Sequence, residues 1–286
     1  MANSSGSSTS YHVRSISLPC RSHPAIIRVK EELNKLKTLE TPCCQTSEAI
    51  CNSLSGLAEL YDCTNDLLGL QLTKKSALID CLLDGSVRLL DICGGTRDIV
   101  SQIKEQTREL ESSIRRRKGD MSIESSIAEF NSFRRRMKKE AKRLIASLKQ
   151  IKKQYEALPM LDSDQKHSSL IGLLTEVTLS SILIYQSLLM FVTVPVSKTK
   201  GRRWSAITKL IHTERVSCEE ENMNELERID AALISLCRSR KGEKIESAQR
   251  GLVALETHFE GIESNLECVF RHLIKTRTLF LNMASN

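Results

Sequence analysis

The sequence predicts an all-α protein: an elongated antiparallel bundle of long helices, preceded by a disordered N-terminal tail. Three observations lead to this prediction. The 286 residues include only 12 Gly and 5 Pro, so turns are few and regular elements are long. Apolar residues recur at helical spacing over most of the chain. Residues 1–22 are rich in serine and lack that spacing, as is typical of a segment that cannot form a core.

The first two predicted helices lie before residue 71. Pro24 suits the first turn of a helix, which ends before Thr41-Pro42 and has its apolar positions at Ile27, Leu33 and Leu36. The second helix runs from about residue 48 to residue 70. Its positions on one apolar face are Ile50, Leu54, Leu57, Leu60, Tyr61, Leu67 and Leu68.

The third predicted helix starts near Lys75, and Gly94-Gly95 interrupts it. The sequence Gly-Gly-Thr-Arg is small, flexible and basic, as a phosphate-binding loop would be. However, no Gly-Lys-Ser/Thr follows it and no strand precedes it. We therefore favour a kink or a close helix contact at these two glycines.

A fourth helix is predicted from Asp120 to Pro159, because Lys118-Gly119 ends the third helix. Its apolar stripe is continuous: Ile127, Phe130, Phe133, Met137, Ala141, Leu144, Leu148, Ile151 and Tyr155. The basic side chains expected opposite this stripe are Arg134, Arg135, Lys138, Lys139, Lys142, Arg143, Lys149 and Lys152.

The fifth helix, from about Asp164 to Thr193, is apolar nearly all round. No charged residue occurs between Val177 and Ser197, which is about the length that a bilayer requires. Six Ser, Thr and Gln residues dilute this segment. We favour a buried bundle helix over a membrane span.

The C-terminal part is predicted to pack on the same bundle. The predicted organisation is a tag over 1–22, the N-terminal part of the bundle over 23–196, a basic linker over 197–203 and the C-terminal helices over 204–286. Residues 204–212 could form a short helix. Ser217-Cys-Glu-Glu220 matches a capping box for a helix that ends at Lys241-Gly242, and the last helix runs from Glu243 to about Leu281.

Positive charge is concentrated in one segment of the chain. Residues 104–153 contain 16 Lys and Arg against 7 Asp and Glu, a net charge of +9, whereas the remainder contains 26 against 28, a net charge of −2. Localised charge of this kind indicates a partner surface. The candidate basic interaction surface consists of Arg115, Arg116, Arg117, Lys118, Arg134, Arg135, Lys138, Lys139, Lys142 and Arg143.

Three alternatives remain for this basic segment. A plain solvated helix face or a nuclear import tag is the commonest cause of a charge run. Binding to an anionic membrane comes next, because attraction accumulates over clustered Lys and Arg. Nucleic acid is an unlikely partner, because neither aromatic platforms nor a reading helix accompanies the charge.

Two serines are candidate phosphorylation sites. Ser17 follows Arg14 and precedes Pro19 by two residues, the arrangement that 14-3-3 proteins bind when the serine is phosphorylated. Ser205 follows Arg202-Arg203-Trp204, as basophilic kinases prefer. A 14-3-3 protein at phosphorylated Ser17 is therefore one expected partner.

The sequence suggests no catalytic residue, metal site or cofactor. Ten cysteines are present without a Cys-x-x-Cys pair, and the polar N-terminus does not resemble a secretory signal. We therefore expect a reducing compartment and a cytoplasmic protein that is not secreted. A peripheral association with membranes is compatible with this expectation. His167, His212, His258 and His272 lie on predicted amphipathic helices without a catalytic pattern around them, which favours a non-enzymatic protein.

Six blocks of sequence resemble the plant BYPASS-related family: residues 11–19 (YHVRSISLP), 21–24 (RSHP), 57–62 (LAELYD), 83–93 (LDGSVRLLDIC), 113–119 (SIRRRKG) and 266–277 (LECVFRHLIKTR). The likeness covers nearly the whole chain. It implies a plant protein of unsettled molecular function, linked to root and shoot development through the founding member, which is thought to restrain a root-derived mobile signal. The family has no accepted catalytic motif.

Together, residues and resemblance predict a non-enzymatic regulatory protein of plant root and shoot development that acts by protein–protein interaction. The alternative is a peripheral membrane module that binds anionic lipid through its basic helix. A third hypothesis is an enzyme that acts on a small mobile metabolite.

Overall fold

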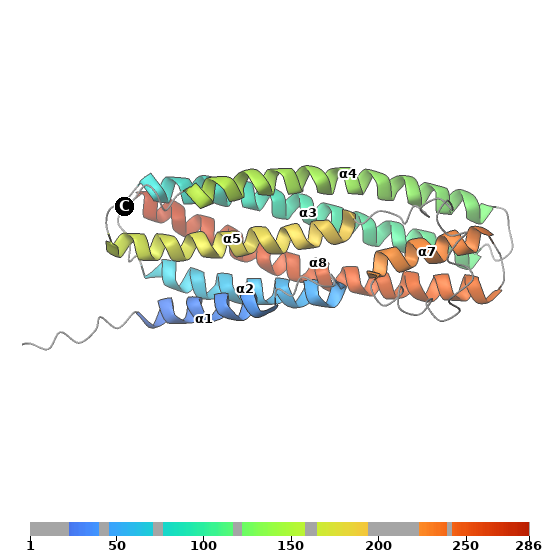
Figure 1. The fold of residues 1–286 in the computed structure, drawn as a ribbon, viewed down its shortest axis with the longest axis horizontal. Helices are drawn as coiled ribbons and strands as arrows, with labels where there is room; N and C mark the ends of the chain where they lie inside the picture. The colour runs from blue at the N-terminus through green and yellow to red at the C-terminus, as the bar shows by residue number, and fades with distance from the viewer. Residues whose placement is uncertain are drawn as a thin grey trace, which may run out of the picture.

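The computed structural model describes residues 23–39, 46–70, 77–116, 122–157, 165–193, 223–238 and 242–285, and every regular element in these ranges is an α-helix. The elements are α1 (Pro24–Leu39), α2 (Ser47–Gly69), α3 (Ala77–Arg116), α4 (Ser122–Ala157), α5 (Gln165–Thr193), α7 (Glu225–Arg238) and α8 (Gly242–Ser285). They lie along one long axis (Figure 1). The prediction of an elongated all-α bundle is confirmed.

The two longest helices, α3 and α8, pack along each other and form the centre of the bundle. On one side, α4 packs on α3 and α5, and on the other side α2 packs on α8 and carries α1. Figure 1 shows α4 and α1 at opposite edges of the bundle, with α7 at one end beside α8. As an edge helix, α4 has one face against the core and one face open to solvent.

The core is built from side chains three and four residues apart on each helix, as an amphipathic helix requires. In α1 these side chains are Val29, Leu33 and Leu36, which are at most 2% exposed. The sequence placed Ile27 on this face, and that placement is wrong, because its side chain is 45% exposed. Residues four apart lie on the same face of a helix. Val29 precedes Leu33 by four residues and therefore shares the face of Leu33, whereas Ile27 precedes Leu33 by six and does not.

The predicted interruption of the third helix does not occur, because α3 continues through Gly94-Gly95. A continuous helix also rules out a phosphate-binding loop at this position. A side chain on Gly95 would place its Cβ 3.3 Å from the Leu144 methyl groups of α4. The expectation of a close helix contact is confirmed, because the missing side chain lets α4 approach.

A second glycine of α3, Gly85, lies against the Tyr155 ring of α4. A Cβ atom at this position would lie 1.9 Å from the Tyr155 hydroxyl and 2.6 Å from its Cζ. We expect Gly85→Ala to lower the free energy of unfolding by about 1–3 kcal/mol, because a buried ring must move. Gly94→Ala is the matched control: nothing lies within 4 Å of its Cβ position, so the better helix propensity of Ala should stabilise the protein by up to about 1 kcal/mol. Urea unfolding of both variants checks this, and equal effects would contradict it.

Burial of Tyr155 also makes stability depend on alkaline pH. Its side chain is 3% exposed, and burial raises the pKa of its hydroxyl to about 12, against about 10 in an unfolded chain. The contribution of Tyr155 is therefore complete below pH 10 and is lost as pH rises toward 12. We expect the stability advantage of the native protein over Tyr155→Phe to fall by about 1.4 kcal/mol per pH unit in that interval. Urea unfolding in steps of pH tests this, and a constant difference would contradict it.

Helix α5 is a member of the bundle in this structure. By length and composition, Leu170–Thr193 could cross a membrane, a property that core helices of bundles share. Tyr185, Leu188 and Leu189 are completely buried, and Ser181 shares a 2.8 Å hydrogen bond with Tyr61 of α2. These contacts agree with the interpretation that we favoured from the sequence.

Helix α7 begins later than the sequence predicted. The expected helix start at Ser217-Cys-Glu-Glu220 is wrong for this helix, because Met223 and Asn224 are not helical and α7 starts at Glu225. Its capping box consists of Asn224 and Glu227, whose side chains accept from each other's backbone N–H at 2.8 and 3.0 Å. Residues 217–220, the linker over 197–203 and the short helix over 204–212 lie outside the described residues.

Candidate interaction surface

The exposed face of α4 carries four of the predicted basic residues: Arg135, Lys139, Lys142 and Arg143. All four are exposed because α4 turns its apolar stripe toward α3 and α5. They lie within about two and a half turns of helix, or roughly 12 Å along its axis. We call these four residues the α4 basic surface.

The charge of the α4 basic surface is largely uncompensated. Arg143 forms a 3.0 Å ion pair with Glu140 on the same helix. Arg135 donates only to the Asn131 carbonyl and the Ser132 hydroxyl, both at 3.3 Å. Among the described residues, Lys139 and Lys142 have no ion-pair partner. Residues 134–153 contain ten Lys and Arg and a single acidic residue, Glu140.

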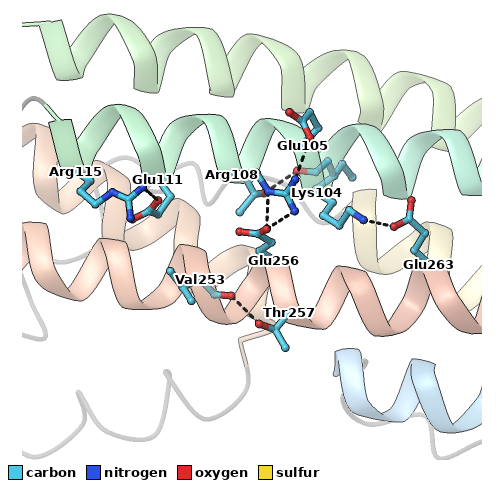
Figure 2. A network of polar contacts seen from close by, with 11 residues as sticks. Lys104, Glu105, Arg108, Glu111, Arg115, Val253, Glu256, Thr257 and Glu263 are labelled. Atoms are coloured by element: carbon cyan, nitrogen blue, oxygen red, sulfur yellow. Dashed lines mark hydrogen bonds and ion pairs between the residues drawn. The ribbon is translucent and has the colours of Figure 1, made fainter.

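Cations of α3, in contrast, are used inside the bundle (Figure 2). Lys104 pairs with Glu263, and Arg108 pairs with Glu256 at 2.7 Å, both across the contact between α3 and α8. Arg97 pairs with Glu267 in the same row. These pairs compensate Lys104 and Arg108, so most of the excess charge that the sequence assigned to residues 104–153 lies on α4, where residues 134–153 contain ten Lys and Arg.

The remaining basic candidates lie at the end of α3. Arg115 pairs with Glu111 one turn earlier at 3.9 Å, and Arg116 donates from Nε to the Ser112 carbonyl at 3.3 Å. Both side chains are exposed. Arg117 and Lys118 lie outside the described residues. The structure therefore places Arg115 and Arg116 at the end of α3 where the chain passes to α4, about 15 Å along the axis from Arg135.

Arg134 does not belong to the basic surface, which corrects the prediction for this residue. Its side chain is 0% exposed and forms an ion pair with Asp230 of α7 at 3.6 Å between Nη2 and Oδ2, and Asp230 is 1% exposed. Nη1 of Arg134 donates to the Val192 carbonyl at 3.4 Å. Nε and Nη2 of Arg134 and both Asp230 oxygens have no hydrogen-bond partner among the described residues. A buried pair with unsatisfied atoms costs desolvation energy that its attraction only partly offsets.

The Arg134–Asp230 pair is part of a polar junction where α2, α4, α5 and α7 meet. Asn224 donates from Nδ2 to the Phe191 carbonyl at the end of α5, at 3.4 Å. Glu225 accepts from the Ser47 hydroxyl at 2.9 Å and from its backbone N–H at 3.2 Å, so it caps the start of α2. A carboxylate at this position also favours the helix dipole. The junction fixes α7 at the end of α5.

Burial dominates the electrostatics of this junction. It lowers the pKa of Arg134 and raises the pKa of Asp230, although each charge opposes the shift of the other. Lys138, one turn along α4, has a pKa lowered to about 8, first by burial and then by the Arg134 charge. Lys138 is half-buried and therefore contributes less to the α4 basic surface than its exposed neighbours.

The sequence did not identify Asp230 or Glu225 as important. A signal for Asp230 does exist: it lies four residues after Leu226 and three before Leu233, on the apolar face of its helix. A charged residue in such a position requires a buried partner. No comparable signal exists for Glu225, whose partner is 178 residues away.

The remaining predictions concern two phosphorylation sites and the absence of a metal site. Ser17 and Ser205 lie outside the described residues. Within the described ranges, no group of three or more His, Cys, Asp or Glu side chains is placed to hold a metal ion.

Comparison with known proteins assigns most of the chain to a family model. The family model described as Protein BPS1 matches residues 53–283, a range that begins in α2 and ends in the last turn of α8. No curated protein and no solved structure matches the chain.

Proposed function

The chain belongs to the BYPASS-related family, described as Protein BPS1, which implies a plant developmental regulator, and from this premise we propose how it acts. It is a non-enzymatic protein of root and shoot development, and it works by binding another protein through the α4 basic surface. The exposed and uncompensated cations of α4 are the observation that carries this proposal.

The shape of the surface supports a protein partner. It lies on the edge helix of the bundle, so it is available without rearrangement of the core, whereas Lys104 and Arg108 of α3 are paired with α8. Charged surfaces of this kind direct association and select partners of opposite charge. The complementary partner is an acidic protein surface.

Partner recovery from plant extracts tests this proposal. Tagged native protein is compared with Lys139→Glu/Lys142→Glu and with the control Lys30→Glu/Lys275→Glu, which makes the same change in net charge at exposed positions of α1 and α8. We expect the α4 variant to lose specific partners that the native protein and the control both retain. Equal recovery by all three proteins would reject the α4 basic surface.

Flotation with vesicles separates this function from the alternative, a peripheral membrane module. Attraction of clustered cations to anionic lipid is strong enough to measure at low salt. We expect the full chain to remain unbound to vesicles that contain phosphatidylserine. Flotation that depends on Lys139 and Lys142 would favour the membrane module instead.

A 14-3-3 protein at phosphorylated Ser17 is a second proposed partner, supported by Arg14 and Pro19 around that serine. Binding of a purified 14-3-3 protein to phosphorylated chain, but not to phosphorylated Ser17→Ala, is the expected result.

We also propose a cytoplasmic location. Fractionation with salt and detergent washes tests it, because recovery only in detergent would contradict it.

A further inference from the structure

Helix α2 covers one side of α8 along part of its length. A Cβ atom on Gly261 of α8 would lie 3.4 Å from the Cys51 Sγ of α2. Asn265 donates from Nδ2 to the Cys51 carbonyl at 3.2 Å, and Thr276 donates from Oγ1 to Asn65 Oδ1 at 2.7 Å. Since α2 also packs on α5, it lies in the crevice between α5 and α8.

The same side of α8 continues past the start of α2. His258, Ala254 and Ser247 precede Gly261 by three, seven and fourteen residues, so they lie on nearly the same side of the helix. The contacts of Cys51 show that α2 runs parallel to α8 and begins at about the level of residue 259. Helix α2 therefore does not cover this part of α8.

Helix α7 takes the place of α5 in this part of the bundle. Figure 1 shows α7 following α5 along the long axis, and Asn224 at its start donates to the Phe191 carbonyl near the end of α5. The crevice between α7 and α8 thus continues the crevice in which α2 lies. Glu225, which caps α2, lines this continuation.

The crevice between α7 and α8 contains two hollows. One has a volume of about 250 Å³, and the buried side chains of Ile229 and Leu255 line it. The other has a volume of about 340 Å³. Arg228, Ala232 and Ser247 line both hollows and join them. We call the two hollows together the α7–α8 groove.

Positive charge lines the α7–α8 groove on both helices. Lys244 of α8 lies at one end of the groove and forms no ion pair among the described residues. Arg228 of α7 reaches Glu225 only at 3.9 Å, and this carboxylate already accepts from the Ser47 hydroxyl. Glu225 is the only described Asp or Glu that lines the groove. An occupant with carboxylates along its edges is therefore the complementary one.

We propose that the α7–α8 groove binds an acidic amphipathic helix of a partner protein. The groove continues a crevice that holds a helix of this chain, α2, so its shape suits a helix. From His258 to Lys244 it is about 21 Å long, or about four helical turns. Apolar side chains one or two turns apart on the partner occupy the two hollows, and its carboxylates meet Arg228 and Lys244. A contact of this length is small, so the complex is reversible.

The α7–α8 groove is separate from the α4 basic surface. Asp230 of α7 faces Arg134 of α4, whereas Ala232 follows Asp230 by two residues and therefore points to the opposite side of α7. A partner helix in the groove adds a contact beyond the one proposed for α4. Substitutions on α7 and α8 test it independently.

Selection from a displayed library of helical peptides tests the proposal, with the full native chain as the bait. The peptides are about 16 residues long and carry varied apolar residues at helical spacing, with either Glu or Lys at the flanking positions. We expect enrichment of the peptides with Glu only. If no peptide is enriched, or if peptides with Lys are enriched equally, the proposal is overturned.

Fluorescence anisotropy with one enriched peptide and purified full chains then locates its binding site. Ala254→Trp fills the groove from an exposed position and should weaken binding by about tenfold or more. Val253→Trp is the matched control, because Val253 is the preceding residue, is 52% exposed and does not line the groove. It should bind as the native chain does. Equal urea midpoints show that both variants are folded.

Charge reversal provides the second comparison. Arg228→Glu/Lys244→Glu should weaken binding of the peptide by about tenfold, whereas Lys30→Glu/Lys275→Glu, with the same change in net charge, should not. Native affinity of Ala254→Trp for the peptide would overturn the proposal. Loss of binding in Lys139→Glu/Lys142→Glu alone would do the same and would assign the peptide to the α4 basic surface. A native chain that is dimeric in light scattering, with a monomeric Ala254→Trp variant, would instead assign the groove to a second copy of the chain.

Discussion

Asp230→Ala is expected to lower the free energy of unfolding by about 3–5 kcal/mol. The substitution removes the only described charge that opposes Arg134, whose side chain is 0% exposed. Arginine does not give up its proton in a folded protein, so the native state of the variant must bury an isolated cation or expose it by moving α7. Urea unfolding followed by circular dichroism measures the loss.

Two further variants distinguish a buried pair from an ordinary core contact. Replacement of both partners by apolar residues, Arg134→Met/Asp230→Leu, should restore most of the lost stability, because the pair itself is costly to desolvate. Glu246→Ala, at an exposed position of α8, should change stability by less than about 0.5 kcal/mol. If Asp230→Ala costs less than about 1 kcal/mol, or if the double variant is no better than the single one, the description of the junction is wrong.

Phe259→Ala is the second large expected effect, with a loss of about 3–5 kcal/mol. Phe259 of α8 is completely buried and packs on Phe191 of α5, with ring centroids 6.2 Å apart. The substitution removes a buried ring between the two helices, and the cost of the resulting cavity adds to the lost burial. Ile274→Ala, which is on α8 but 46% exposed, should cost much less because little buried surface is lost.

This prediction also tests the position of α5. If α5 leaves the bundle for a bilayer, Phe191 does not contact Phe259, and truncation of Phe259 should have little effect on the remaining helices. Unfolding of the protein without detergent, with native and variant chains at equal concentration, measures the difference. A loss below about 1 kcal/mol would show that α5 does not pack on α8 at this point.

The sequence predicted the helices well because apolar spacing reports directly on which face of a helix is buried. The apolar positions named for the fourth helix, from Ile127 to Tyr155, lie on the inner face of α4 in the structure. Helix ends were less accurate. Asn224 and Glu227 cap α7, but Ser217 and Glu220 have the same chemistry at the same spacing. Local sequence cannot decide between two such caps.

Charge was harder to interpret than apolar spacing. Arg134 and Arg135 are adjacent in sequence and identical in chemistry, yet one is buried and the other exposed. The distinction was available, since Arg134 lies four residues after Phe130 and three before Met137, which is the spacing of the core. Its partner Asp230 comes from a helix 96 positions later, and only the tertiary structure brings the two together.

The basic segment, residues 104–153, shows a further limit of the sequence. All its cations were counted together. The structure separates them, because Lys104 and Arg108 pair with carboxylates of α8, whereas Lys139 and Lys142 are exposed. Net charge of a segment does not show which side of a helix each charge occupies.

Genetic complementation most directly tests the central claim, that the protein regulates development through the exposed charge of α4. Plants that lack this chain receive the native form, Lys139→Glu/Lys142→Glu, or Lys30→Glu/Lys275→Glu at equal protein levels and equal thermal stability. The account predicts that the native form and the α1/α8 control restore root and shoot growth and that the α4 variant does not. Full restoration by the α4 variant would contradict it.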